Sequence, residues 1–380
     1  MEYIRNCKFA NLFEFEMVKI AWKAISKNCN MKYLVLLIGV LFLTSCKTEP
    51  KKQIAQKVIA VQREKPFEGK IIAIDTALYT SFKSADLENF YKSFNNETVW
   101  QLTTLRQYVL NEFKNAENEG LFPRDYNYSK LLDLESKIST LSDDELVNYD
   151  LLLTFNFQKY IKHISQGKLN PTTIYNDWDL KVKKTNVSKI LIDAFEKEDQ
   201  FAAIIDSCKP HHDVYRKLKT ALAILNTFPK DSLKAIDVAD KIVPNDSLKA
   251  LIAIKKRLMY WHDLKANDSL TPIYDSKTVE AIKRFQLRHG LASDGVIGKG
   301  TLNALNFTKN KRKHQIIANM ERWKWYPNEL AEEYLLINIP NYSLVAVKNN
   351  DTIRTHKIIV GTAKRKTPIL TSKLSYAVFN

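Results

Sequence analysis

The sequence predicts an α+β protein, helical over most of its length and β-rich near its C-terminal end. Between residues 84 and 225 apolar residues recur every three or four positions, which is the spacing of one face of an α-helix. Residues 246–306 predict three short helices around one small core. From residue 334 apolar and polar residues alternate instead, as they do in β-strands. The 380 residues leave room for two or three domains, and 45% hydrophobic residues argue against wholesale disorder.

We interpret residues 1–46 as a signal segment that ends at a lipid-attachment site. Met31 is the expected start, because Lys32 follows it and residues 33–43 form an apolar run. That run is shorter than the roughly 20 residues needed to cross a bilayer, but it fits the hydrophobic part of a signal peptide. The tetrapeptide Leu-Thr-Ser-Cys that follows resembles a lipobox, so we expect Cys46 to carry the lipid. The alternative is an uncleaved hydrophobic stub with an incidental cysteine.

Residues 47–68 predict a tether, because they are polar, rich in lysine and without periodicity. Fully extended, such a segment reaches at most about 70 Å. Residues 69–228 are expected to form a helical scaffold domain. Its apolar stripes are interpreted as core and not as ligand contacts; they comprise Leu87, Phe90, Tyr91 and Phe94, then Leu102, Leu105, Val109 and Phe113.

Three side chains that can bind metals lie close together at Cys208, His211 and His212. A metal site would need a second cluster of ligands elsewhere in the chain, so we expect no metal and no other cofactor. Cys208 is expected to be a buried thiol. The mature protein would keep only this cysteine and Cys46, so a structural disulfide is not expected.

Residues 229–308 hold the predicted three-helix module. Asp275 or Ser276 caps its central helix, and Gly290 ends that helix in the left-handed conformation. Asp294-Gly295 then forms a turn before a second short helix.

The pentapeptide Asp-Ser-Leu-Lys-Ala occurs twice, at residues 231–235 and 246–250. Both copies are interpreted as helix starts with an Asp or Ser cap, and the second opens a predicted helix over residues 246–261. Five residues do not define a repeat protein.

The order AIKRFQLRHGL-x2-DGVIG-x2-TLNALN over residues 281–306 resembles the peptidoglycan-binding module of bacterial cell-wall enzymes. This resemblance implies peptidoglycan as a partner. It does not identify the side chains that contact the glycan. The residues that match the pattern of the module are Phe285, Gln286, Gly290, Asp294, Gly295, Gly298 and Thr301.

The formal net charge of +16 suits an anionic partner, whether nucleic acid, a membrane surface or a carboxylate-rich polymer. The alternative to a wall-binding module is a helix-turn-helix that reads DNA through Lys283, Arg284 and Arg288. The predicted export signal argues against that alternative, so we expect no nucleic-acid partner.

Three further motifs resemble the helical scaffold domain of large periplasmic L,D-transpeptidases. They are GL-x-P-x-DY at residues 120–126, YD-x-LLT at 149–154 and GKLNP at 167–171. The sequence NMERWKW at residues 319–325 resembles the helix that joins binding module to catalytic domain in the same family, and we expect it to connect them over residues 309–333.

Residues 334–380 predict strands at 334–339, 344–347 and 353–360 with a turn at 349–351. The order NIP, VG, TP and VFN in this segment resembles the opening of the L,D-transpeptidase catalytic domain. In that family a Cys in an [ST]-H-G-C motif attacks a stem peptide of the wall, a His takes the thiol proton, and the thioester yields a 3→3 cross-link.

That catalytic pair is absent from these residues, because no cysteine follows Cys208 and the last histidine is His356. We therefore expect no catalytic residue in the chain as given, expect it to be inactive, and interpret Asn380 as the edge of a fragment.

The sequence thus predicts a lipid-anchored L,D-transpeptidase of the cell envelope that faces the periplasm. Lys47 follows the lipidated cysteine where an Asp would favour the inner membrane, so we expect the outer membrane. The alternative is a non-catalytic peptidoglycan-binding lipoprotein that tethers membrane to cell wall. A third hypothesis is a cytosolic nucleic-acid binder.

Overall fold

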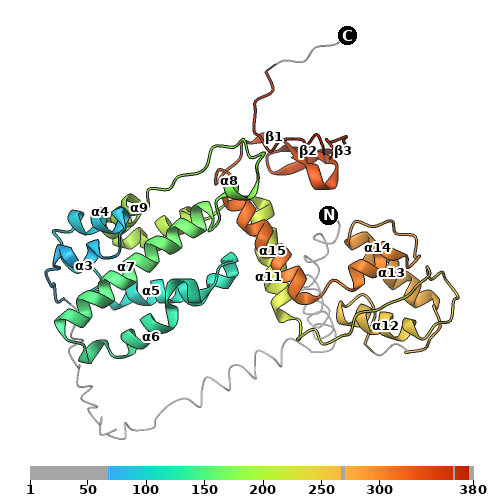
Figure 1. Cartoon of the computed structure of the whole chain (residues 1–380), viewed down its shortest axis with the longest axis horizontal. Helices are drawn as coiled ribbons and strands as arrows, with labels where there is room; N and C mark the ends of the chain where they lie inside the picture. The colour runs from blue at the N-terminus through green and yellow to red at the C-terminus, as the bar shows by residue number, and fades with distance from the viewer. Residues whose placement is uncertain (1–66, 68, 267–269, 363, 376–380) are drawn as a thin grey trace, which may run out of the picture. The chain divides into compact units, whose positions relative to one another are not determined.

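The computed structural model describes residues 67, 69–266, 270–362 and 364–375 (Figure 1). These residues form two compact units. The smaller unit contains residues 235–306 and is inserted in sequence into the larger one, which holds the residues on either side. The α+β prediction is confirmed, because helices dominate and one small antiparallel sheet lies near the C-terminal end. In the described ranges no helix is long and apolar enough to cross a membrane.

Several predictions concern residues outside the described ranges. These are the signal segment with its start at Met31, the lipid on Cys46, nearly all of the tether, and the last five residues up to Asn380. They remain predictions.

The helical part of the larger unit is built around the long helix α7 (Asp143–Gln166). A capping box starts it: the Glu145 N–H donates to Ser142 Oγ, and the Ser142 N–H donates back to the Glu145 carboxylate at 2.8 Å. The surrounding helices are α3 (Thr76–Thr80), α4 (Ala85–Ser93), α5 (Thr103–Lys114), α6 (Tyr128–Ser136), α8 (Pro171–Ile174), α9 (Val187–Glu196), α10 (Phe201–Ser207) and α11 (Asp213–Thr227).

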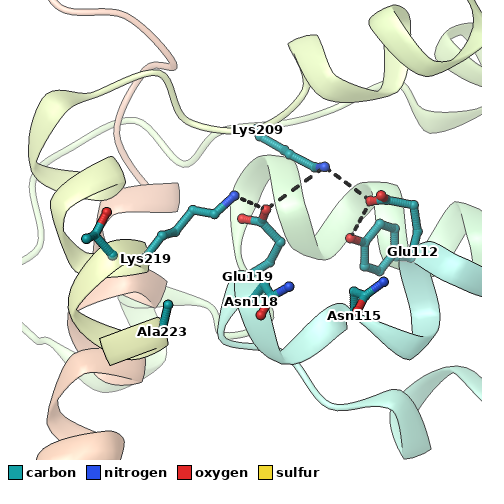
Figure 2. A pocket seen from close by; sticks show the side chains of 9 residues that line it. Glu112, Asn115, Asn118, Glu119, Lys209, Lys219 and Ala223 are labelled. Carbon is teal, nitrogen blue, oxygen red and sulfur yellow. Dashed lines mark hydrogen bonds and ion pairs between the residues drawn. The ribbon is translucent and has the colours of Figure 1, made fainter. Parts of the chain in front are cut away.

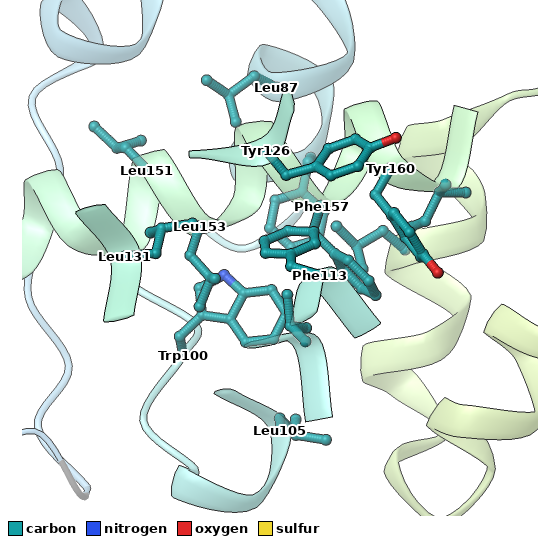
Figure 3. Close-up of a cluster of buried hydrophobic side chains, with 14 of the residues drawn as sticks. Leu87, Trp100, Leu105, Phe113, Tyr126, Leu131, Leu151, Leu153, Phe157 and Tyr160 are labelled. Carbon is teal, nitrogen blue, oxygen red and sulfur yellow. The ribbon is translucent and has the colours of Figure 1, made fainter. Parts of the chain in front are cut away.

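The core of this helical part is rich in aromatic side chains (Figure 3). The ring of Phe113 stacks on that of Tyr126 with centroids 5.3 Å apart, and Trp100 meets Phe157 edge-on at 6.0 Å. Fully burying one such ring contributes roughly 1.5–3 kcal/mol, so this cluster is a major source of stability.

The predicted apolar stripes are largely core, with one clear exception. Leu102 is the N-cap residue of α5 and is 39% exposed. Phe67, predicted to belong to the tether, is instead buried beneath the guanidinium of Arg106, 5.6 Å from its ring centre. The packed core therefore begins slightly before the predicted scaffold boundary at residue 69.

The smaller unit contains the three predicted helices, α12 (Ala250–Tyr260), α13 (Ser276–Arg288) and α14 (Lys299–Leu305). Its two ends are held together by Asn306, whose side chain accepts from the Ile236 N–H at 2.8 Å and donates to the Ile236 carbonyl at 2.7 Å. The unit also has its own buried side chains, so we expect it to fold alone. These include Leu251, Ile254, Leu258, Tyr274, Ile282 and Phe285.

The prediction that both Asp-Ser-Leu-Lys-Ala copies start helices is wrong. The first copy is not helical, because Asp231 bonds the backbone N–H groups of Leu233 and Lys309 at 3.2 Å each. The second copy contains only the first residue of α12, Ala250, and no Asp or Ser caps that helix, since the Asp246 carbonyl pairs with the Tyr274 N–H at 2.8 Å. Pairing with a distant segment prevented the helix from starting at Asp246.

The predicted connecting helix is α15 (Lys309–Lys324), which ends nine residues earlier than expected. It packs along α11, where Met320 forms a small buried cluster with Tyr215 and Leu222. The helix is thus an integral part of the larger unit and not a free connector.

Strands β1 (Glu333–Asn338), β2 (Ser343–Lys348) and β3 (Asp351–Lys357) form an antiparallel sheet in the order β1-β2-β3. Asn349 and Asn350 join the last two with positive φ angles of 49° and 65°, as a tight hairpin turn requires. The third strand ends at Lys357 and not at the predicted residue 360.

Candidate functional site

The turn of the smaller unit is built around the buried side chain of Gln286. Its Nε2 donates to Asp294 Oδ1 and the Val296 carbonyl at 2.9 Å each, and to Thr301 Oγ1 at 3.1 Å. Its Oε1 accepts from the Gly295 N–H at 2.9 Å. One amide on α13 therefore holds the whole turn and the first residues of α14 in place.

The glycines of this motif shape the backbone. Gly290 has φ +69°, and the Leu291 N–H reaches back to the Gln286 carbonyl at 2.9 Å to close the end of α13. Gly295 has φ +77°, and a Cβ there would lie 3.0 Å from Val279. Gly298 is the N-cap of α14, with open space where a Cβ would project.

The predicted cap of α13 is confirmed and carries a second interaction. Asp275 accepts from the Thr278 N–H at 2.9 Å and from the buried ammonium of Lys255 at 2.5 Å. Burial opposes the charge of Asp275, but these hydrogen bonds lower its pKa to about 2. The Tyr274 hydroxyl donates to the Gly295 carbonyl at 2.5 Å.

The matching residues of the module therefore build the fold of the turn. Phe285 is fully buried, and hydrogen bonds join Gln286 to Asp294, Gly295 and Thr301. Two arginines of the DNA-reading alternative are engaged within the unit: Arg284 donates to the Asp263 carbonyl at 2.9 Å and Arg288 pairs with its carboxylate at 2.5 Å.

The YD-x-LLT motif of the larger unit also serves the fold. The Asp150 carboxylate accepts from the Tyr91 hydroxyl at 2.6 Å and from the N–H groups of Val99 and Trp100 at 2.9 Å each. Thr154 accepts from the Trp100 indole at 2.7 Å. Complete burial raises the pKa of Asp150 to about 6, although these hydrogen bonds act in the opposite direction.

Three motifs distant in sequence meet where α15 contacts the scaffold, which we call the α15 junction. Gly167 has φ +85°, and a Cβ there would lie 2.7 Å from Glu321 Oε1 and 2.8 Å from Trp325 Nε1. The same Glu321 oxygen accepts from the Leu169 N–H at 2.7 Å. Gly120 lies against Met320, with room for a Cβ at 3.6 Å.

A buried charge network completes the α15 junction. Lys324 is fully buried and donates to the Glu119 carbonyl at 2.8 Å, with the Glu321 carboxylate 3.9 Å away. Burial lowers the pKa of Lys324 to about 8, against the effect of the two carboxylates. The Glu119 side chain accepts from the Tyr215 hydroxyl at 2.8 Å.

Cys208 is buried, as expected, and its thiol donates to the Ile204 carbonyl at 3.5 Å. Burial raises its pKa. His211 lies 3.6 Å from the Glu329 carboxylate, while His212 is buried and has a lowered pKa for that reason. No cluster of metal ligands occurs in the part of the chain that the structure describes.

Comparison with known families gives two matches. A model described as a scaffold domain matches residues 85–222, and a model of a peptidoglycan binding domain matches residues 248–305. Over residues 248–305 the chain is similar to a peptidoglycan-binding module. Together the matches support an architecture like that of a cell-wall enzyme, an interaction with peptidoglycan, and association with the wall or envelope. No curated protein matches the chain.

Several residues that organise these regions are not marked by any motif in the sequence. Lys255 and Tyr274 are examples, because the sequence around a single lysine or tyrosine in an amphipathic segment does not indicate its hydrogen-bond partner. Glu321 and Gly167 were assigned to separate motifs, and only the structure brings them together. His356 lies on β3 and is exposed.

Proposed function

We propose that these 380 residues belong to a peptidoglycan L,D-transpeptidase. The observation that carries this proposal is the α15 junction. Gly120 and Gly167, from two scaffold motifs, pack against the NMERWKW helix, and the chain then enters an antiparallel sheet. A helix that merely linked two domains would not need Gly167, whose lack of a side chain leaves the space for Glu321 and Trp325.

The proposed organisation is a scaffold over residues 69–228, a wall-binding module over 229–308, a connecting segment over 309–333, and the opening of a catalytic domain over 334–380. The scaffold and α15 would hold the sheet, while the module would hold the polymer. Peptidoglycan is the proposed partner of the module, through its stem peptides and glycan.

The proposed chemistry is acyl transfer through a cysteine. A thiolate attacks a stem-peptide carbonyl, terminal D-alanine leaves as the thioester forms, and the amine of a second stem takes the acyl group to give the 3→3 cross-link. Nucleophilic cysteines need nearby positive charge or a paired base. Cys208 is buried with a raised pKa, so we propose that the chain as given has no turnover.

We also propose that Cys46 carries a lipid anchor and that residues 47–68 act as the tether. The anchored protein would face the periplasm from the outer membrane. A single acyl chain binds membranes only marginally, whereas two or more hold firmly, so a diacylated cysteine would suffice.

The second candidate is a non-catalytic lipoprotein that ties the membrane to the wall. The match of residues 248–305 to a peptidoglycan binding domain supports it, because binding to the wall needs no nucleophile. The DNA downstream of codon 380 separates the two candidates. An in-frame Ser/Thr-His-Gly-Cys motif supports the enzyme, and an early stop in several isolates supports the tether.

The wall-binding proposal is tested with residues 235–306 and purified peptidoglycan sacculi. We expect the module to sediment with the sacculi, and salt to weaken this only partly, because hydrogen bonds contribute as well as charge. Binding equal to that of an unrelated protein of the same charge would contradict the proposal.

A further inference from the structure

A pocket of about 590 Å³ opens in the scaffold between α5, the turn η2 (Ala116–Glu119) and α11 (Figure 2). Its volume is typical of sites for small molecules, which span roughly 300–1,000 Å³. All of its walls belong to the larger unit. Neither the family matches nor the proposed acyl transfer assigns it a role.

Both signs of charge line the pocket. Lys209 lies 3.1 Å from Glu112 and 3.9 Å from Glu119, and Lys219 lies 2.5 Å from Glu119 (Figure 2). Burial opposes the charge of Lys209, but Asp206 and the two glutamates raise its pKa and keep it protonated. The four side chains Glu112, Glu119, Lys209 and Lys219 sum to no net charge.

The protein's own hydrogen bonds use the two glutamates of the pocket to different extents. Both oxygens of Glu119 already accept hydrogen bonds, one from Lys219 and the other from the Tyr215 hydroxyl. Glu112 uses only Oε2, which accepts from the Tyr160 hydroxyl at 2.8 Å and from Lys209 at 3.1 Å. Within the described residues, Glu112 Oε1 accepts no hydrogen bond.

The remaining free groups lie toward the opening. Lys219 is 37% exposed along its side chain and has one carboxylate partner, so two of its ammonium protons remain available. Asn118 lines the pocket, and its side-chain amide makes no hydrogen bond within the described residues. The pocket therefore offers an anionic acceptor, a cationic donor and a neutral amide.

We infer that this pocket binds a short zwitterionic peptide, with its ammonium at Glu112 and its carboxylate at Lys219. A purely anionic ligand would face the free oxygen of Glu112, and a purely cationic one would face Lys219 and Lys209. A ligand with both charges meets a partner at each end, and charge-assisted hydrogen bonds of this kind are the stronger ones. The stem peptides of peptidoglycan have this chemistry, so the physiological ligand rests on the proposed function.

The test uses the 380-residue chain and the dipeptide lysyl-D-alanine in calorimetric titration. We expect the free dipeptide to bind at least tenfold more tightly than its diacetylated form, which lacks the ammonium groups, or its C-terminal amide, which lacks the carboxylate. Equal binding of all three forms, or no binding of the dipeptide at millimolar concentration, would overturn the inference.

Two tryptophan substitutions on α11 give a matched pair. Ala223 lines the pocket, whereas Ala221 is exposed on the same helix and does not. We expect Ala223→Trp to lower the dipeptide affinity at least tenfold and Ala221→Trp to leave it unchanged; unchanged affinity in both variants would refute the site. If Ala223→Trp fails to fold, Lys219→Gln replaces it and should abolish the preference for the dipeptide over its amide.

Sacculus sedimentation separates this inference from the proposed function. Ala223→Trp should still sediment with sacculi, because the module is a different unit. Dipeptide binding without sacculus binding would support the pocket and contradict the wall-binding module. Sacculus binding without dipeptide binding would support the wall-binding module and contradict the pocket inference.

Discussion

The carboxylate of Glu321 on α15 accepts a 2.7 Å hydrogen bond from the backbone N–H of Leu169, 152 residues earlier in the chain. This contact fixes the helix that leads into the sheet against the scaffold. Gly167, two residues before Leu169, leaves the space that the Glu321 side chain occupies.

Removing the acceptor at Glu321 should destabilise the larger unit. We expect Glu321→Ala to lower its free energy of unfolding by about 1–3 kcal/mol, because the Leu169 N–H is left unpaired. Glu321→Gln keeps an oxygen at that position and should restore most of the loss. Urea unfolding at constant m-value measures both, and equal effects of Ala and Gln would contradict this role of the side-chain oxygen.

A methyl group at Gly167 should be more damaging than one at Gly120, although both residues have positive φ angles. Backbone strain alone costs on the order of 1–3 kcal/mol at such positions. Gly167→Ala adds contacts of 2.7–2.8 Å with Glu321 and Trp325, whereas Gly120→Ala meets Met320 at an ordinary 3.6 Å. The difference in urea midpoint between the two variants checks the packing of the α15 junction.

Gln286 should be essential to the wall-binding module. We expect Gln286→Leu to destabilise residues 235–306 by about 1–3 kcal/mol, because the Gly295 N–H and the Val296 carbonyl lose their partner. Sacculus binding should fall with it. Leu287→Gln is the control, since Leu287 is 67% exposed and such surface changes stay within about 0.5 kcal/mol. A fully stable Gln286→Leu module would contradict the organising role of this side chain.

Asp150 and His163 should give opposite pH dependences. Burial raises the folded pKa of Asp150 from 3.8 to about 6, so its contribution to stability is full below pH 4 and is lost as the pH rises to about 6. Burial lowers the folded pKa of His163 from 6.5 to about 4, so its contribution is full above pH 6.5 and is lost as the pH falls to about 4. Each shift corresponds to about 3 kcal/mol.

Single variants should therefore reveal one dependence at a time. We compare the change in stability of the larger unit between pH 6.5 and pH 4 with that of the unsubstituted chain. Asp150→Asn should shift this change toward lower stability at pH 4. His163→Gln should shift it toward higher stability at pH 4. Thermal unfolding at a series of pH values measures the slope of stability against pH for each variant, relative to the unsubstituted chain. Slopes of the same sign in both variants would show that one of the two burial effects is misassigned.

These 380 residues should form no adduct with a carbapenem, a class of compound that traps the cysteine of L,D-transpeptidases as a thioester. Cys208 is buried and its pKa is raised, so little thiolate is available at neutral pH. Intact-mass measurement after incubation decides this. An adduct that disappears in Cys208→Ala would place the nucleophile at Cys208.

Cys46 should determine membrane attachment. Cys46→Ser is expected to leave the protein soluble or uncleaved after cell fractionation, because the proposed acyl chains cannot attach. Unchanged membrane recovery together with a mature-length product would rule out lipidation at this residue.

Local chemistry in the sequence was sufficient to predict the helices of the module and the class of the fold. The Asp275 cap and the left-handed Gly290 act within one turn of α13, so their effect does not depend on distant residues. The hairpin turn at Asn349 and Asn350 was predictable for the same reason. The order of the motifs likewise indicated a wall-binding module before any contact was known.

The tertiary structure decided which distant segments meet. The helix predicted to start at Asp246 starts later, because the Asp246 carbonyl pairs with the Tyr274 N–H. No local pattern in the sequence identifies this competing partner. In the sequence Gly167 is only the first residue of the GKLNP motif, yet in the fold its lack of a side chain leaves space for Glu321 and Trp325. Side chains far apart in sequence become neighbours only after the core has packed, so local spacing carries no information about such pairs.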